Sequence, residues 1–180
     1  SDDGTILALG APYNDATASS AGHVRVYIYS GGKWSQYGSD IDGEAAVDQF
    51  GKTVVLNNDG SRLAVGSDFN EGPGTHSNGT ENATGHVRVY EYSLGDWNQI
   101  GSDIDGEAAG DWSGGYQPHS SAFNGDGSII AIGATLNDGI NGENSGHVRV
   151  YQYSDENWIQ LGSDIDGEAA GDGFTLKDLV

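Results

Sequence analysis

The sequence contains three copies of one unit of about sixty residues, and this internal repeat limits the possible fold more than any other feature. The segment Gly-His-Val-Arg-Val-Tyr recurs at spacings of 63 and 61 residues, at residues 22–27, 85–90 and 146–151. The segment Ser-Asp-Ile-Asp-Gly-Glu-Ala-Ala follows it at residues 39–46, 102–109 and 163–170. One tryptophan lies between the two segments in each copy, at Trp34, Trp97 and Trp158. The three units are therefore expected to share one fold.

Each unit is predicted to form four short strands, and the second copy shows all of them. We expect these strands at residues 50–56, 62–66, 86–92 and 96–104. The first two form a hairpin around the Asn-Asn-Asp-Gly turn at 57–60, because Asn and Gly tolerate the positive φ of a tight turn. The third strand alternates valines on one face with histidine, arginine and tyrosines on the other. No segment shows a helical period, so the chain is predicted to be all-β.

Large side chains on both faces of the third strand indicate that each sheet packs against a neighbour on each side. Radial repetition of four-stranded antiparallel sheets is typical of a β-propeller. We expect three propeller blades, at residues 1–49, 50–111 and 112–172, with 173–180 starting a further blade. The repeated tryptophan is expected to pack between blades. Propellers close with about four to eight blades, so the chain is predicted to be a fragment that needs neighbouring blades or subunits for closure.

Several short motifs resemble those of a known family. Phe50 and Gly51 begin the second copy, and the second strands end in Gly-Ala-Pro at 10–12, Gly-Ser-Asp at 66–68 and Gly-Ala-Thr at 133–135. These features, over essentially the whole chain, resemble FG-GAP repeats, which build the integrin-alpha-type propeller. The two recurring segments are similar to a subgroup in secreted or surface proteins of marine microbes. The resemblance implies seven blades, a role in adhesion and a secreted or cell-surface location.

The chain departs from this family at its calcium loop. Many FG-GAP repeats carry Asp-x-Asn-x-Asp-Gly between the first and second strands. The turns here, at 57–60 and 124–127, offer too few oxygens for an ion that takes six to eight ligands. The family's calcium site is therefore not expected at these turns.

Acidic residues dominate the charge, with 27 Asp and Glu against 7 Lys and Arg and a net charge of −20. This balance argues against nucleic-acid partners, and no apolar run approaches the ~20 residues of a membrane span. Blade geometry places eighteen acids at one end of the fold, which would suit a protein or glycan ligand or a cation.

The metal-ligand candidates, with calcium as the expected ion, are Asp40, Asp42, Glu44, Asp48, Asp103, Asp105, Glu107, Asp111, Asp164, Asp166, Glu168 and Asp172. A competing interpretation, which we favour, has these acids capping turns and pairing with Arg25, Arg88 and Arg149.

Catalytic signatures are missing from the sequence. There is no cysteine, no Gly-x-Ser-x-Gly motif and no phosphate-binding loop, so the chain is predicted not to be an enzyme. His23, His86 and His147 occupy one repeated position and are expected to pack within their own units. The segment 112–123, which contains His119, is irregular and has no assigned role. Asn78 and Asn82 begin N-glycosylation sequons in a loop expected to be exposed.

Three hypotheses for the function follow. The first is a non-catalytic extracellular or surface propeller for binding and adhesion, assisted by a cation. The second is a structural subunit of an extracellular or surface assembly. The third is a glycan-active enzyme or lectin, for which Trp112 supplies one loop aromatic. The first two are favoured, and the sequence names no ligand.

Overall fold

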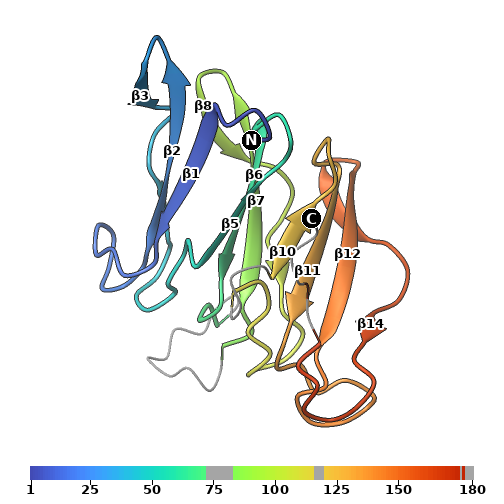
Figure 1. The fold of residues 1–180 in the computed structure, drawn as a ribbon. Helices are drawn as coiled ribbons and strands as arrows, with labels where there is room; N and C mark the ends of the chain where they lie inside the picture. The colour runs from blue at the N-terminus through green and yellow to red at the C-terminus, as the bar shows by residue number, and fades with distance from the viewer. Residues whose placement is uncertain (72–82, 116–119, 175, 177–180) are drawn as a thin grey trace.

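The computed structural model describes residues 1–71, 83–115, 120–174 and 176, and all regular structure in these residues is β. The strands form three separate antiparallel sheets, which confirms the all-β prediction (Figure 1). The first sheet contains β1 (Ile6–Ala11), β2 (His23–Ser30), β3 (Lys33–Gln36) and β4 (Ile41–Asp42). The second contains β5 (Thr53–Leu56), β6 (Arg62–Ser67), β7 (His86–Ser93), β8 (Asp96–Gln99) and β9 (Ile104–Asp105). The third contains β10 (Ser121–Phe123), β11 (Ile129–Ala134), β12 (His147–Ser154), β13 (Asn157–Gln160) and β14 (Ile165–Asp166).

The long strands β2, β7 and β12 occupy equivalent places in the three sheets. Each pairs along one edge with the strand before it, in the same register: Gly10 lies opposite Val24, Gly66 opposite Val87 and Gly133 opposite Val148. Its other edge pairs with two short strands, such as β8 and β9 on β7. The repeat seen in the sequence is therefore a repeat in the structure.

The sheets differ from the prediction at their outer strand. The expected continuous strand 96–104 is divided into β8 and β9, so the second and third sheets have five strands instead of four. The division falls at Gly101, whose φ of 72° takes the chain out of the pleat. The first strand of the second unit, β5, also begins at Thr53 rather than at Phe50, because the Phe50 amide donates to the carbonyl of Ala21, in the loop between β1 and β2.

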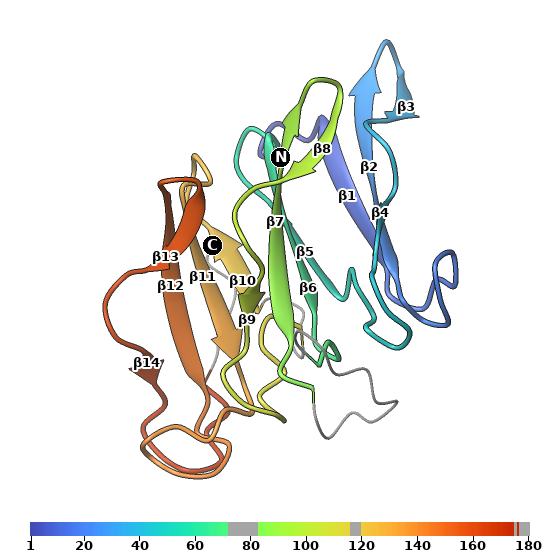
Figure 2. The same ribbon diagram turned by 180° about the vertical axis from the view of Figure 1, so that it is seen from behind.

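Neighbouring sheets pack face to face, always in the same sense (Figure 2). We call the side carrying Arg88 and Tyr90, and their equivalents, the tyrosine face, and the side carrying Val87 and Val89, and their equivalents, the valine face. The valine face of the first sheet packs on the tyrosine face of the second, and the second packs on the third in the same way. The first interface is built from buried residues Val24, Val26, Ile41, Phe50, Leu63, Val65, Tyr90 and Trp97. The second is built from Ala64, Val87, Val89, Ile104, Ile130, Ile132, Tyr151 and Trp158.

Two of the repeated tryptophans join the sheets by a hydrogen bond as well as by packing. The Trp97 Nε1–H donates to the Tyr37 carbonyl at 2.8 Å, and the Trp158 Nε1–H donates to the Ile100 carbonyl at 3.0 Å. The acceptor belongs to the preceding sheet in both cases. The expected packing of these tryptophans between repeats is therefore present.

Repeated glycines allow backbone segments to pass each other closely. A Cβ atom on Gly106 would lie 2.0 Å from the Thr84 carbonyl oxygen, and one on Gly66 would lie 2.0 Å from the Gly114 carbonyl oxygen. Real Cβ atoms do not approach a backbone oxygen this closely, so both positions require glycine.

Gly106→Ala is therefore expected to lower the free energy of unfolding by about 1–3 kcal/mol, as overpacking does elsewhere. The measurement is urea denaturation at an unchanged m-value. Gly125→Ala is the control, because a Cβ there meets only the Asn58 side chain at 3.2 Å. Equal losses in the two variants would contradict the close-approach argument.

No helix within the described part of the chain is long and apolar enough to cross a membrane.

Candidate functional site

Loops from all three sheets gather at one end of the molecule, the lower end in Figure 1. One set connects β1, β6 and β11 to the long strands β2, β7 and β12, and the other set leaves each sheet after its last short strand. We call this the acidic end, because it contains the repeated Asp-Ile-Asp-Gly-Glu-Ala-Ala segments. Its described loops are residues 12–22, 43–52, 68–71, 83–85, 106–115, 135–146 and 167–174.

The aspartate two residues after each repeated segment caps its own turn. The Asp48 Oδ2 atom accepts from the Ala45 amide at 3.0 Å, and Asp111 accepts from the Ala108 amide at 2.9 Å. Asp172 accepts from the Ala169 amide at 2.8 Å in the third copy. These three carboxylates therefore have a structural role in the loop.

The first acid of each segment is held by side chains of its own sheet. The Asp40 carboxylate accepts two hydrogen bonds from Arg25, at 2.9 and 2.7 Å, and these lower the pKa of Asp40. Asp103 accepts from Arg88 at 3.1 Å. Burial is the largest single influence on Asp103 and opposes its ionisation, but Arg88, Gln99 and His86 together outweigh it, so the pKa of Asp103 is lowered. Each of these acids also accepts from the glutamine four residues before it, as Asp164 does from Gln160 at 2.7 Å.

The glutamate of each segment reaches forward to the next sheet. Glu44 forms an ion pair with Arg88, and the Glu107 Oε1 atom lies 3.5 Å from Arg149 Nη1. The Arg88 and Arg149 side chains are only 4% and 8% exposed, whereas Arg25, which no described sheet covers, is 45% exposed. The repeated acids thus neutralise arginines buried between sheets.

The repeated histidines lie beside these ion pairs. His86 is 2% exposed and packs edge-on against Phe50 of the connecting loop. Burial lowers the pKa of His86 to about 4, and the Arg88 charge adds to this effect. Burial also lowers the pKa of His147. Both imidazoles are therefore neutral at pH 7, as packing residues would be.

Two groups of side chains have ligand atoms within 4.8 Å of one another: His86 with Asp103 and Asp105, and His147 with Glu107 and Asp164. Calcium takes six to eight oxygen ligands. Each group offers two carboxylates and one imidazole, and an arginine already pairs with one carboxylate in each. These groups therefore do not fit calcium.

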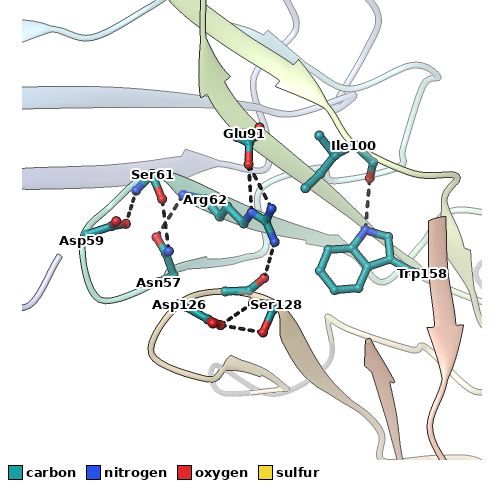
Figure 3. A network of polar contacts seen from close by, with 10 residues as sticks. Asn57, Asp59, Ser61, Arg62, Glu91, Ile100, Asp126, Ser128 and Trp158 are labelled. Carbon is teal, nitrogen blue, oxygen red and sulfur yellow. Dashed lines mark hydrogen bonds and ion pairs between the residues drawn. The ribbon is translucent and has the colours of Figure 1, made fainter. Parts of the chain in front are cut away.

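At the end of the molecule opposite the acidic end, the aspartates of the hairpin turns accept hydrogen bonds from their own turns (Figure 3). Asp59 accepts from the Ser61 amide and Asp126 from the Ser128 amide, both at 2.9 Å. Arg62 lies between the two turns, where it pairs with Glu91 and donates to the Gly127 carbonyl at 3.0 Å. The two hairpin turns are thus joined by an arginine.

The structure brings together four of the twelve acids predicted as metal ligands, Asp103, Asp105, Glu107 and Asp164, each beside a histidine that sequence reasoning assigned only to packing. The alternation of residues along β7 could have predicted this place for the histidines, because it puts His86 on the same face as Arg88 and so near the acids that pair with Arg88. In the described residues, the other eight acids join no such group.

Trp112 is half-buried and packs edge-on against Phe69, so it is not an open loop aromatic. Asn78, Asn82 and His119 lie outside the described residues.

Comparisons with known proteins leave the family open. No family model matches the chain, and no curated protein matches it. Among solved structures, the chain is similar to that of a hypothetical selenium-binding protein from Sulfolobus tokodaii, with 12% sequence identity and a TM-score of 0.48. The match covers 91% of this chain and 40% of that one, so the chain spans less than half of that protein's length. A likeness at this level carries no argument about function, and the FG-GAP resemblance stays an expectation from the sequence.

Proposed function

We propose that the chain is a segment of a non-catalytic β-propeller, secreted or at the cell surface, that binds a protein ligand through its acidic end. The propeller is supported by three sheets that pack in one sense, and by the proximity of β1 to β5 and of β5 to β10 near one side of the stack. The ligand is expected to carry basic side chains, because acids outnumber bases on this chain by 27 to 7.

The observation that carries the proposal is the gathering of all three acidic segments at one end. Turn caps and ion pairs within the chain account for many of these acids, but not for the outermost ones. Glu143 is exposed and Asp166 is partly exposed. Such carboxylates can pair with arginine or lysine of a partner, and their attraction steers association at low ionic strength.

The experiment measures binding of a short oligolysine peptide at low and moderate salt by fluorescence anisotropy. Neutralising two acids of the acidic end, Glu143→Gln with Asp166→Asn, is expected to weaken binding by about threefold or more at low salt, since each lost pair contributes roughly 0.2–1 kcal/mol. The control removes the same charge at the opposite end, Asp155→Asn with Glu156→Gln, in the exposed β12–β13 turn. Equal weakening in both variants would show that binding follows net charge alone and would overturn the proposal.

Calcium assistance, expected from the sequence, is tested in two further variants by measuring the melting temperature. If calcium binds at the acidic end, millimolar calcium raises the melting temperature, Asp105→Asn removes the rise and Asp59→Asn keeps it. The described contacts favour a basic ligand instead, and an unchanged melting temperature is the result that agrees with them.

The structural-subunit hypothesis has one observation in its favour. The outer faces of the first and third sheets expose large apolar side chains, among them Leu9, Trp34, Ile165 and Phe174.

A further inference from the structure

We propose that the tyrosine face of the first sheet and the valine face of the third sheet bind each other, so that copies of this chain associate head to tail. The partner at each face is a second copy of this chain. The inference rests on the two interfaces already present between the sheets and does not depend on the proposed ligand of the acidic end.

The tyrosine face of the first sheet exposes side chains that are buried in the other two sheets. Trp34 is 46% exposed, whereas Trp97 and Trp158 are each 8% exposed. Leu7 and Leu9 of β1 are about half exposed, although their equivalents in β6 and β11 are fully buried at the sheet interfaces. The difference arises because no described sheet lies on this face.

The valine face of the third sheet shows the complementary difference. Ile165 is 51% exposed, whereas the equivalent Ile104 is 5% exposed under the next sheet. Phe174 is 39% exposed, whereas the equivalent Phe50 is 1% exposed and packs on His86 and Tyr90. Phe174 keeps the backbone position of Phe50, since Gly146 bridges Phe174 as Gly22 bridges Phe50.

Charged and polar groups on the two free faces match in the same way. Glu44 and Glu107 each pair with the arginine of the following sheet, which leaves Glu168 exposed on one free face and Arg25 on the other. The Trp34 indole would find its acceptor at Leu161, the equivalent of Tyr37 and Ile100, which accept from Trp97 and Trp158. The same side chains that join the sheets are therefore available for a second copy.

This match also fixes the orientation of the partner. A symmetric contact between two tyrosine faces would offer Arg25 no equivalent of Glu168 and would leave both tryptophans without the carbonyl acceptor that the internal interfaces supply. Only a contact of unlike faces reproduces the interfaces seen within the chain. Such a contact is heterologous and repeats, giving a ring if it closes and a filament if it does not.

One position of the first sheet departs from the internal interfaces. The Ser39 amide donates to Asp96 Oδ1 at 2.7 Å, and the Ser102 amide donates to Asn157 Oδ1 at 3.1 Å. The equivalent pair at the free faces is Ser163 and Lys33, and lysine accepts no hydrogen bond. Association between copies therefore lacks this hydrogen bond, which makes positions 33 and 163 suitable for a crosslink.

The first experiment measures mass by sedimentation velocity over a range of concentrations. We expect species heavier than the 18.7 kDa monomer, with their proportion rising with concentration. Trp34→Ala is expected to weaken association by about tenfold or more, because buried tryptophans dominate interface energies. Leu94→Ala is the matched control, since Leu94 is fully exposed in the β7–β8 turn, away from both free faces. A monomer at every concentration, or equal effects of the two substitutions, would overturn the proposal.

The second experiment fixes the orientation, and the absence of native cysteine makes it direct. The double variant Lys33→Cys with Ser163→Cys is expected to form a ladder of disulfide-linked oligomers, because the Ser39 hydroxyl already lies 3.0 Å from Asp96 at the equivalent place. The single variant Lys33→Cys is expected to stay monomeric on a non-reducing gel. Efficient dimers of the single variant would show that like faces meet, and would overturn the head-to-tail arrangement.

Discussion

Replacing Trp97 or Trp158 with alanine is expected to lower the free energy of unfolding by about 3–5 kcal/mol, the usual cost of deleting a buried aromatic side chain. Each indole fills the space between two sheets and donates a hydrogen bond to the preceding sheet. Trp97 also packs against Tyr37 and Tyr92, at centroid distances of 6.2 and 5.4 Å. Its removal therefore opens a cavity and leaves the Tyr37 carbonyl without its side-chain donor.

Trp34→Ala supplies the control within the same chain. Trp34 occupies the same repeat position but contacts Tyr29 of its own sheet and is half exposed, so its removal should cost about 1 kcal/mol or less. Chemical denaturation at concentrations where all variants are monomeric measures the three values. Similar losses for Trp34 and Trp97 would show that the tryptophans stabilise each sheet separately, and the described packing between sheets would be wrong.

The second large effect is expected at the buried arginine Arg88. The double variant Glu44→Gln with Asp103→Asn removes both of its carboxylate partners, while burial keeps the guanidinium away from water. Leaving a buried charge uncompensated costs about 3–5 kcal/mol. Asp40→Asn removes the partner of the exposed Arg25, and an exposed pair of this kind contributes only about 0–1 kcal/mol.

Denaturation at two salt concentrations distinguishes the two arginines. The loss from Asp40→Asn should fade at high salt, because ions screen exposed charges, whereas the loss at Arg88 should persist. If the double variant is as stable as the unmodified chain, Arg88 finds other partners and the ion pairs between sheets are not needed for stability.

Local sequence patterns were enough to predict most of the strands. The alternation of the segment 86–92 predicts β7 and its two faces, and the Asn-Asn-Asp-Gly turn predicts the β5–β6 hairpin. The tryptophan spacing predicts packing between sheets. These features depend on periods of two residues and on turn chemistry, which neighbouring residues determine.

Contacts between residues far apart in the sequence could not be predicted. Glu44 and Arg88 are far apart in sequence, and nothing in either copy alone indicates that an acid of one sheet neutralises the arginine of the next. The sequence also assigns equal roles to Arg25, Arg88 and Arg149. In the structure, a neighbouring sheet buries Arg88 and Arg149, whereas no described sheet covers Arg25. The outer strand was expected to be continuous because the positive φ of Gly101 has no distinct signal among thirty glycines.

The unlike faces of each sheet have a consequence for how such a protein can evolve. Every internal boundary joins a valine face to a tyrosine face, so a duplication of one whole repeat would create a boundary of a kind that the molecule already has. Deleting one whole repeat would restore the same kind of boundary between its former neighbours. The gene could therefore lengthen or shorten in steps of one unit without new interface residues, whereas an insertion of half a unit would place two unmatched surfaces together.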